Sequence, residues 1–214
     1  MSSSLPVYGA AVTAREIGIL GGTFDPPHLG HLRIASGVAD ALSLDEVRFM
    51  PTGRPNFKRD LAVTAAAHRV AMLELAIADD PRFTLDAREV ERPGVTYTVD
   101  TLAELTDELP ATQIDFIVGA DSAKTLVHWK GAARLAQLAR FVVACRPGFD
   151  FDEVLAVHDA SPLDFDLLFV EVDALDVSSR ELRAALAAGE ESSAEMLCAP
   201  VAEYIRREGL YRPA

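Results

Sequence analysis

The sequence is poor in cysteine, in basic residues and in long apolar runs. Its only two cysteines, Cys145 and Cys198, exclude a disulfide scaffold and a cysteine-based metal site, and they suit a reducing compartment. No apolar run approaches the roughly 20 residues that a membrane span needs. The chain carries 20 Lys and Arg against 33 Asp and Glu, a net charge of −13. This excess of acid argues against general binding to nucleic acid or to an anionic membrane surface.

The N-terminal residues lack the basic start of a secretory leader, because no Lys or Arg precedes Arg15. We therefore expect residues 1–15 to form a flexible tail on a cytoplasmic protein. Residues 16–214 contain no linker-like break in composition and no internal repeat. The uniform composition of this segment predicts that it forms a single domain.

Short apolar segments alternate with segments of helical periodicity along residues 16–214. This alternation predicts an α/β fold, with a doubly wound, mostly parallel sheet and helices on both faces. Strands are expected at residues 16–22, 47–51, 83–91, 114–120, 140–147 and 166–172. Ligands of such Rossmann-like sheets bind beyond the carboxyl ends of the strands, so the residues that follow strands are the candidates for a site.

The predicted helices carry apolar residues at spacings of three and four. One includes Leu32, Ala35, Ala39 and Leu42, and a second begins at Thr64 and places Ala66, Val70, Leu73 and Ile77 on its buried face. A third covers residues 98–110. Two more begin near Ser178 and Val201.

The first strand–helix junction reads Gly21-Gly22-Thr23-Phe24-Asp25-Pro26-Pro27-His28-Leu29-Gly30-His31. Two glycines allow a sharp turn and close approach to a ligand, and two prolines stiffen the loop. His28 and His31 fall at the start of the helix, where free N–H groups and the positive end of the dipole favour a phosphate. Two alternatives to phosphate binding remain for His28 and His31: they could be two ligands of a metal site, or they could lie on an ordinary surface turn. The position behind a buried strand favours phosphate binding.

Two further segments suggest anion binding. Ser178 and Ser179 can cap a helix that follows the last strand, with Arg183 four or five residues further on. Residues 51–59, directly after the second strand, hold three cations including Lys58 and no acid. An ordinary capped helix and a basic surface loop are the alternatives.

The junction GGTFDPPHLGH resembles the signature of the nucleotidyltransferase superfamily that carries a [T/H]-x-G-H motif. That superfamily also has an I-S-S-T-x-[IV]-R pattern, which Val177–Arg183 matches except that Arg180 replaces the usual Thr. Further along, Thr96–Leu102 is similar to the Y-T-x-D-T-L stretch of bacterial nicotinate-mononucleotide adenylyltransferases. The segments Phe116–Ser122, Trp129-Lys130 and Pro200–Tyr211 fit the same family in the same order.

The resemblance implies transfer of AMP from ATP to nicotinate mononucleotide in NAD biosynthesis. It assigns catalysis to His28, His31, Lys58 and Arg183, with Mg²⁺ accompanying ATP rather than held in a metal site of the protein. It assigns binding of nicotinate mononucleotide to Lys58, Thr96, Tyr97, Thr98 and Trp129, with the nicotinate ring stacked on Trp129. It also places Asp121 at the ribose of adenosine. The implied ATP-binding residues are Gly21, Gly22, Thr23, Phe24, His28, His31, Gly119, Asp121, Ser178, Ser179 and Arg183.

Other functions are also compatible with the sequence of the first strand–helix junction. An adenylyltransferase for nicotinamide mononucleotide or phosphopantetheine would match the Y-T-x-D-T-L and W-K features only by chance. A class I aminoacyl-tRNA synthetase needs a K-M-S-K-S loop, which is absent from the sequence. A non-catalytic nucleotide sensor is the alternative from a different class. The sequence allows a homo-oligomer and indicates no nucleic-acid or membrane partner.

Overall fold

The computed structural model describes residues 15–53 and 63–212. Arg15, the last residue of the expected tail, begins the first strand, and residues 1–14 lie outside the described residues. The division into a tail and a single domain stays a prediction. Within the described residues, no helix is both long and apolar enough to cross a membrane.

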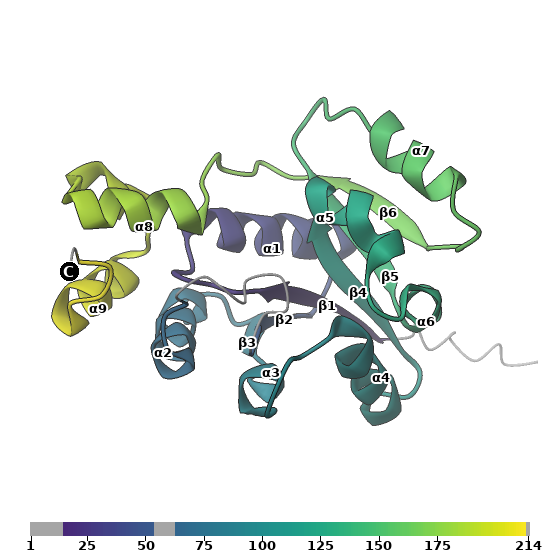
Figure 1. Cartoon of the computed structure of the whole chain (residues 1–214), viewed down its shortest axis with the longest axis horizontal. Helices are drawn as coiled ribbons and strands as arrows, with labels where there is room; N and C mark the ends of the chain where they lie inside the picture. Colours follow the sequence, from purple (N-terminus) through teal and green to yellow (C-terminus); the bar gives the residue numbers. More distant parts are fainter. Residues whose placement is uncertain (1–14, 54–62, 213–214) are drawn as a thin grey trace, which may run out of the picture.

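A parallel sheet of six strands forms the centre of the described chain (Figure 1). The strand order is β3-β2-β1-β4-β5-β6, and every neighbouring pair is parallel. The chain winds outward from β1 to β3 and then returns to place β4 on the other side of β1. The order therefore reverses beside β1, where a doubly wound sheet binds its ligands. The strands are β1 (Arg15–Gly22), β2 (Glu46–Pro51), β3 (Phe83–Leu85), β4 (Thr112–Gly119), β5 (Arg140–Cys145) and β6 (Leu167–Glu171).

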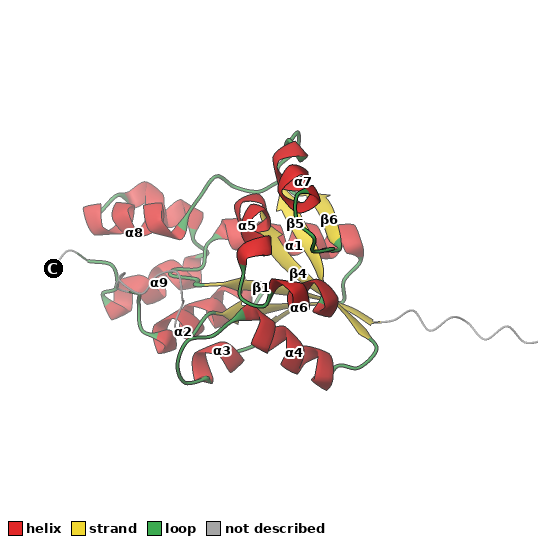
Figure 2. Ribbon diagram, turned by 45° about the vertical axis from the view of Figure 1, so that its right-hand side comes forward, coloured by secondary structure: helices red, strands yellow, loops and turns green. Residues whose placement is uncertain are grey.

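Helices cover both faces of the sheet (Figure 2). Each face has its own apolar core. Side chains of β5 alternate between them, since Val142 enters one core and Val143 the other. One core is closed by α1 (Leu29–Leu42), α2 (Ala66–Ile77), α8 (Ser179–Ala188) and α9 (Ala199–Glu208). The other is closed by α4 (Thr98–Glu108), α5 (Ala120–Thr125), α6 (Ala132–Leu138) and α7 (Asp152–Asp159). Short turns complete the chain: α3 (Arg88–Glu91), η2 (Leu126–His128) and η3 (Glu191–Met196). The predicted fold class is confirmed.

Two local predictions were wrong. The expected strand at residues 83–91 ends at Leu85, because Asp86 accepts hydrogen bonds from the backbone N–H and the guanidinium of Arg88 and so begins the short helix α3. The buried face of α2 is also rotated from the predicted one. It consists of Arg69, Met72, Leu73, Ala76 and Ile77.

Candidate active site

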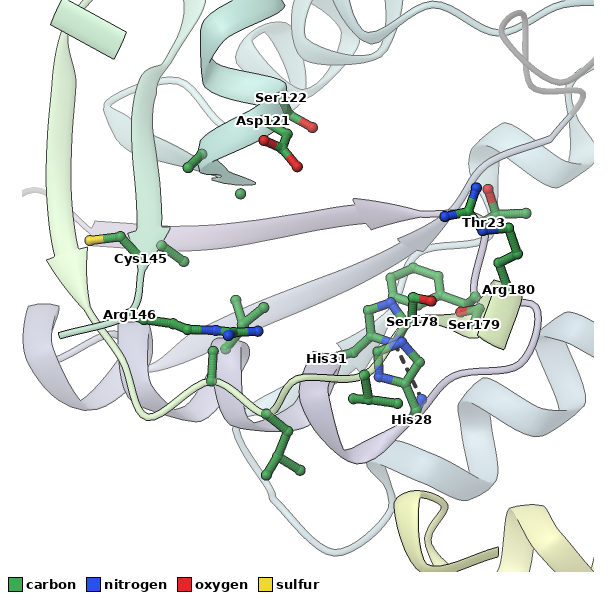
Figure 3. Close-up of a pocket in the computed structure, with 18 of the residues that line it drawn as sticks. Thr23, His28, His31, Asp121, Ser122, Cys145, Arg146, Ser178, Ser179 and Arg180 are labelled. Atoms are coloured by element: carbon green, nitrogen blue, oxygen red, sulfur yellow. Dashed lines mark hydrogen bonds between the residues drawn. The ribbon is translucent and has the colours of Figure 1, made fainter. Parts of the chain in front are cut away.

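A cavity of about 1060 Å³ lies beyond the carboxyl ends of β1, β4 and β5 (Figure 3). Four segments line it: the start of α1 with the loop before it, the start of α5, the residues after β5, and the start of α8. Gly21 and Gly22, the last two residues of β1, are not among its lining residues. The cavity does bring together nine of the predicted ATP residues: Thr23, Phe24, His28, His31, Gly119, Asp121, Ser178, Ser179 and Arg183.

The phosphate loop, which we define as residues 23–28, joins β1 to α1. The sharp backbone turn expected at the glycines falls instead on Phe24, whose φ is +49°. The ring of Phe24 is buried, and a Cβ on Gly22 would lie 3.0 Å from it. Gly22 therefore makes room for the ring. The peptide bond between Asp25 and Pro26 is cis.

The two histidines of the loop lie against each other at the start of α1. Their rings stack with centroids 3.6 Å apart, and the backbone N–H of His28 donates to Nδ1 of His31 at 3.2 Å. Because Nδ1 of His31 accepts, its neutral imidazole carries the proton on Nε2. Nδ1 of His28 is buried and has no hydrogen-bond partner among the described residues.

Burial sets the protonation state of both imidazoles. It lowers the pKa of His28 to about 4. The pKa of His31 lies well below its usual value, through burial and through the neighbouring His28. Both rings are neutral at neutral pH, so they offer hydrogen bonds rather than positive charge to a ligand.

Asp25 anchors the phosphate loop to the protein interior. Its carboxylate is buried and accepts hydrogen bonds from the Tyr211 hydroxyl at 2.6 Å and from the Thr64 backbone N–H at 3.1 Å. The start of α8 holds the loop as well. Nη1 of Arg183 donates to the Asp25 carbonyl at 2.6 Å, and the Ser179 hydroxyl donates to the Pro26 carbonyl at 2.9 Å. The first turn of α8 and the first turn of α1 are therefore fixed relative to each other.

Arg69 is buried under the same loop, although it stands on the apolar face of α2. Its guanidinium donates to three backbone carbonyls: Thr23 at 2.8 Å, Thr64 at 3.1 Å and Gly53 at 3.3 Å. Gly53 and Thr64 lie on either side of residues 54–62, which include Lys58 and are outside the described residues. The role of Lys58 stays a prediction.

Thr96, Tyr97 and Thr98 lie at the start of α4, with Trp129 on the segment packed against that helix, and none of these four predicted acceptor residues lines the cavity. Tyr97 precedes α4, and Nζ of Lys130 lies 3.6 Å from the centroid of its ring. Trp129, next to Lys130, is half-buried, packs edge-on against Phe116 and donates from Nε1 to the Thr125 hydroxyl at 3.2 Å. Lys130 thus places the segment after η2 against Tyr97 at the start of α4. The binding of the acceptor by these residues stays a prediction.

Thr96 has a different surrounding from its neighbours. Its side chain is buried, and its hydroxyl donates to the Glu89 carboxylate at 3.3 Å. The same carboxylate accepts from Thr101 at 2.8 Å. Glu89 therefore holds the start of α4 on the inside. The Thr96 hydroxyl serves this support, which leaves its backbone as the part that could meet a ligand.

Ser178 caps α8 as predicted. Its oxygen accepts from the Glu181 backbone N–H at 3.2 Å, and its O–H donates to the Glu181 carboxylate at 2.7 Å.

The sequence analysis assigned no role to four residues that the structure places at or under the site: Arg69, Arg146, Arg180 and Tyr211. Arg69 had one signal, an arginine at helical spacing from Leu73 and Ala76. Among the described residues, no group of three or more His, Cys, Asp or Glu is arranged to hold a metal ion.

The reversal of strand order beside β1 and the two helix starts facing one cavity define a Rossmann-like, nucleotide-binding α/β protein. Comparisons with known proteins narrow this class. The family described as cytidylyltransferase-like matches residues 19–185. The probable nicotinate-nucleotide adenylyltransferase of Corynebacterium kroppenstedtii is 40% identical over 199 residues, 93% of this chain and 92% of the relative. That of Leifsonia xyli subsp. xyli is 46% identical over 168 residues, 78% of this chain and 80% of the relative.

Solved structures agree on the fold. The nicotinic acid mononucleotide adenylyltransferase of Plasmodium falciparum complexed with APC has a TM-score of 0.75 at 21% identity, covering 92% of this chain and 97% of that one. The same enzyme complexed with NaAD has a TM-score of 0.74 over the same shares. The chain belongs to the nicotinate-nucleotide adenylyltransferase family of cytidylyltransferase-like proteins.

Proposed function

We propose that this enzyme transfers AMP from ATP to nicotinate mononucleotide, forming nicotinate adenine dinucleotide and pyrophosphate in the cytoplasmic synthesis of NAD. One observation carries the proposal: the starts of α1 and α8, with His28, His31, Ser178 and Ser179, face the same cavity at the switch point of the sheet. Two helix starts give two sets of free N–H groups for one polyphosphate. The names of the relatives support the choice of acceptor.

The reaction needs no general base. The acceptor phosphate has a second pKa near 6, as phosphate monoesters do, and is mostly a dianion at neutral pH. One of its oxygens attacks the α-phosphorus of ATP and forms a new P–O bond. The bond from the α-phosphorus to the bridging oxygen breaks in line, and pyrophosphate leaves with that electron pair. Catalysis then consists of alignment and of stabilising charge on the phosphoryl oxygens.

The imidazoles supply hydrogen bonds for that charge. Nε2–H of neutral His31 is the donor left after Nδ1 accepts from the His28 backbone. His28 lines the same cavity, but its Nδ1 is buried next to Gly30, so that nitrogen is not the one that meets a phosphate. A donor that is already oriented and needs no reorganisation is worth more in a cavity than in water.

The acceptor and the metal complete the proposal. Nicotinate would stack on Trp129, with its carboxylate on the backbone N–H groups around Thr96–Thr98, and Asp121 would accept from the adenosine ribose. Mg²⁺ would accompany ATP, since this ion is usually bound through substrate phosphates and needs no cluster of three protein ligands, and no such cluster occurs among the described residues. When bound, it would neutralise part of the triphosphate charge.

An acceptor panel tests the proposal. The enzyme is mixed with ATP and nicotinate mononucleotide, nicotinamide mononucleotide or phosphopantetheine, and pyrophosphate is measured. We expect product with nicotinate mononucleotide and at least about tenfold lower kcat/KM with the amide, because a carboxylate accepts stronger hydrogen bonds than an amide. A preference for another acceptor would overturn the assignment. Binding of ATP with no pyrophosphate from any acceptor would favour a nucleotide sensor.

A further inference from the structure

Among the described residues that line the cavity, few could give positive charge to a triphosphate. Five of its lining residues are Arg or His: His28, His31, Arg146, Arg180 and Arg183. The two imidazoles are neutral, as argued above. Arg146 forms an ion pair with Asp176 at 2.6 Å. Arg183 donates from Nη1 to the carbonyls of Asp25 and Ser179, at 2.6 and 3.3 Å, and keeps its positive charge because carbonyls are neutral partners.

Arg180 is the third arginine among the described residues of the lining. It is exposed, and no hydrogen bond or ion pair joins it to another of the described residues. It is the second residue of α8, directly after Ser179, so it extends from a helix start that already favours anions. Figure 3 shows it at the end of the cavity that holds Thr23, Ser178 and Ser179, away from Asp121 and Ser122.

Resting on the proposed function, we propose that Arg180 is a further catalytic residue, which binds the β- and γ-phosphates of ATP that leave as pyrophosphate. Arg180 replaces the Thr that is usual in this pattern. A threonine hydroxyl can donate one hydrogen bond, whereas a guanidinium carries a full charge and can bind phosphate oxygens through two parallel N–H groups. Arg183 also holds the phosphate loop through Nη1, and Arg180 supplies a further charge at the same end of the cavity.

Equilibrium binding of ATP and of AMP tests the assignment without any acceptor. AMP has the adenosine and the α-phosphate but lacks the leaving group. We expect Arg180→Ala to raise the Kd of ATP about tenfold or more, since a charge-assisted phosphate contact is lost, and to change the Kd of AMP less than about twofold. Arg180→Lys keeps the charge and should recover most of the ATP affinity. Arg180→Thr should bind ATP more weakly than the parent.

Controls separate this role from a structural one. Arg206→Ala removes the same charge from an exposed position on α9, where Arg206 pairs with Glu203, and should leave ATP affinity unchanged. Melting temperatures of the parent and of Arg180→Ala should agree. The proposal is overturned if Arg180→Ala weakens ATP no more than Arg206→Ala, if AMP weakens equally, or if Arg180→Thr matches the parent.

The result is independent of the acceptor. If ATP affinity depends on Arg180 while nicotinate mononucleotide gives no product, the proposed function fails and the Arg180 assignment stands. If product forms and Arg180→Ala binds ATP as tightly as the parent does, the proposed function stands and the Arg180 assignment fails.

Discussion

The hydroxyl of Tyr211 donates a 2.6 Å hydrogen bond to the carboxylate of Asp25, which lies 186 residues earlier in the chain. Burial and the neighbouring carboxylate raise the pKa of Tyr211, so the phenol keeps its proton at neutral pH. The end of the chain thereby fastens the loop that precedes the two cavity histidines. Asp25 is itself buried, which makes this donor costly to remove.

Removal of the Tyr211 hydroxyl is expected to weaken both stability and catalysis. Tyr211→Phe leaves a buried carboxylate with one donor fewer, which should lower the free energy of unfolding by about 1–3 kcal/mol in a urea titration. It should also lower kcat/KM, because the phosphate loop is less well held. The matched control is Tyr204→Phe, which removes a hydroxyl bonded to His68 on the same part of the chain. Equal activity in the two variants would contradict the role of Tyr211.

Replacement of Arg69 tests the clamp under the phosphate loop. A lysine cannot reach the carbonyls of Thr23, Gly53 and Thr64 together, so Arg69→Lys should lower the free energy of unfolding by about 2–4 kcal/mol. Chemical denaturation measures the loss. Arg134→Lys, at an exposed position on α6, should change it by less than about 0.5 kcal/mol. A stable Arg69→Lys variant would show that the three hydrogen bonds contribute little.

Loss of the His31 imidazole should affect turnover far more than folding. His31→Ala removes a donor aimed at developing phosphoryl charge and is expected to lower kcat by about 10²- to 10³-fold. Steady-state kinetics with ATP and nicotinate mononucleotide give the value. His68→Ala, an equivalent substitution on α2 outside the cavity lining, is expected to retain kcat. Turnover of His31→Ala within a few-fold of the parent would remove His31 from the mechanism.

Acid should destabilise the fold through His28. Below its ordinary pKa of 6.5 the unfolded chain binds a proton there, whereas the folded chain takes it up only near pH 4. The free energy of unfolding should therefore fall as the pH decreases from about 6.5 to about 4, by up to about 3 kcal/mol from this residue. Urea titrations across that range measure the slope. His28→Asn should show a smaller slope, and an unchanged slope would mean that His28 is not buried as a neutral group.

The Trp129 ring is expected to act on the acceptor alone. Trp129→Ala should raise the KM of nicotinate mononucleotide by about tenfold, since stacking on a flat ring contributes roughly 1–1.5 kcal/mol. The KM of ATP should change little, because Trp129 does not line the cavity. Trp129→Phe keeps a flat ring, so its KM for nicotinate mononucleotide should lie between those of the parent and of Trp129→Ala. An unchanged acceptor KM in Trp129→Ala would place the nicotinate ring elsewhere.

Much of the site could be predicted because its signals are local. A helix start, a cap and a glycine-rich junction depend on residues a few positions apart. The sequence pattern alone therefore indicated that Ser178 or Ser179 would cap α8 and that His28 and His31 would begin α1. Nine of the ATP residues that the resemblance implies line one cavity, because the fold brings these short motifs together. The glycines were a partial failure, since the positive φ belongs to Phe24.

The alternation of apolar strands and amphipathic helices was enough to specify a doubly wound sheet, because its period is a property of neighbouring residues. Which face of α2 turns inward, how low the pKa values of the histidines fall, and which carboxylate Tyr211 meets depended on packing between distant segments. Burial and long-range hydrogen bonds arise only when those segments are brought together. Hence the burial of Arg69, the anchor at Asp25 and the place of Arg180, which has no partner in the part of the chain that the structure describes, became visible only in three dimensions.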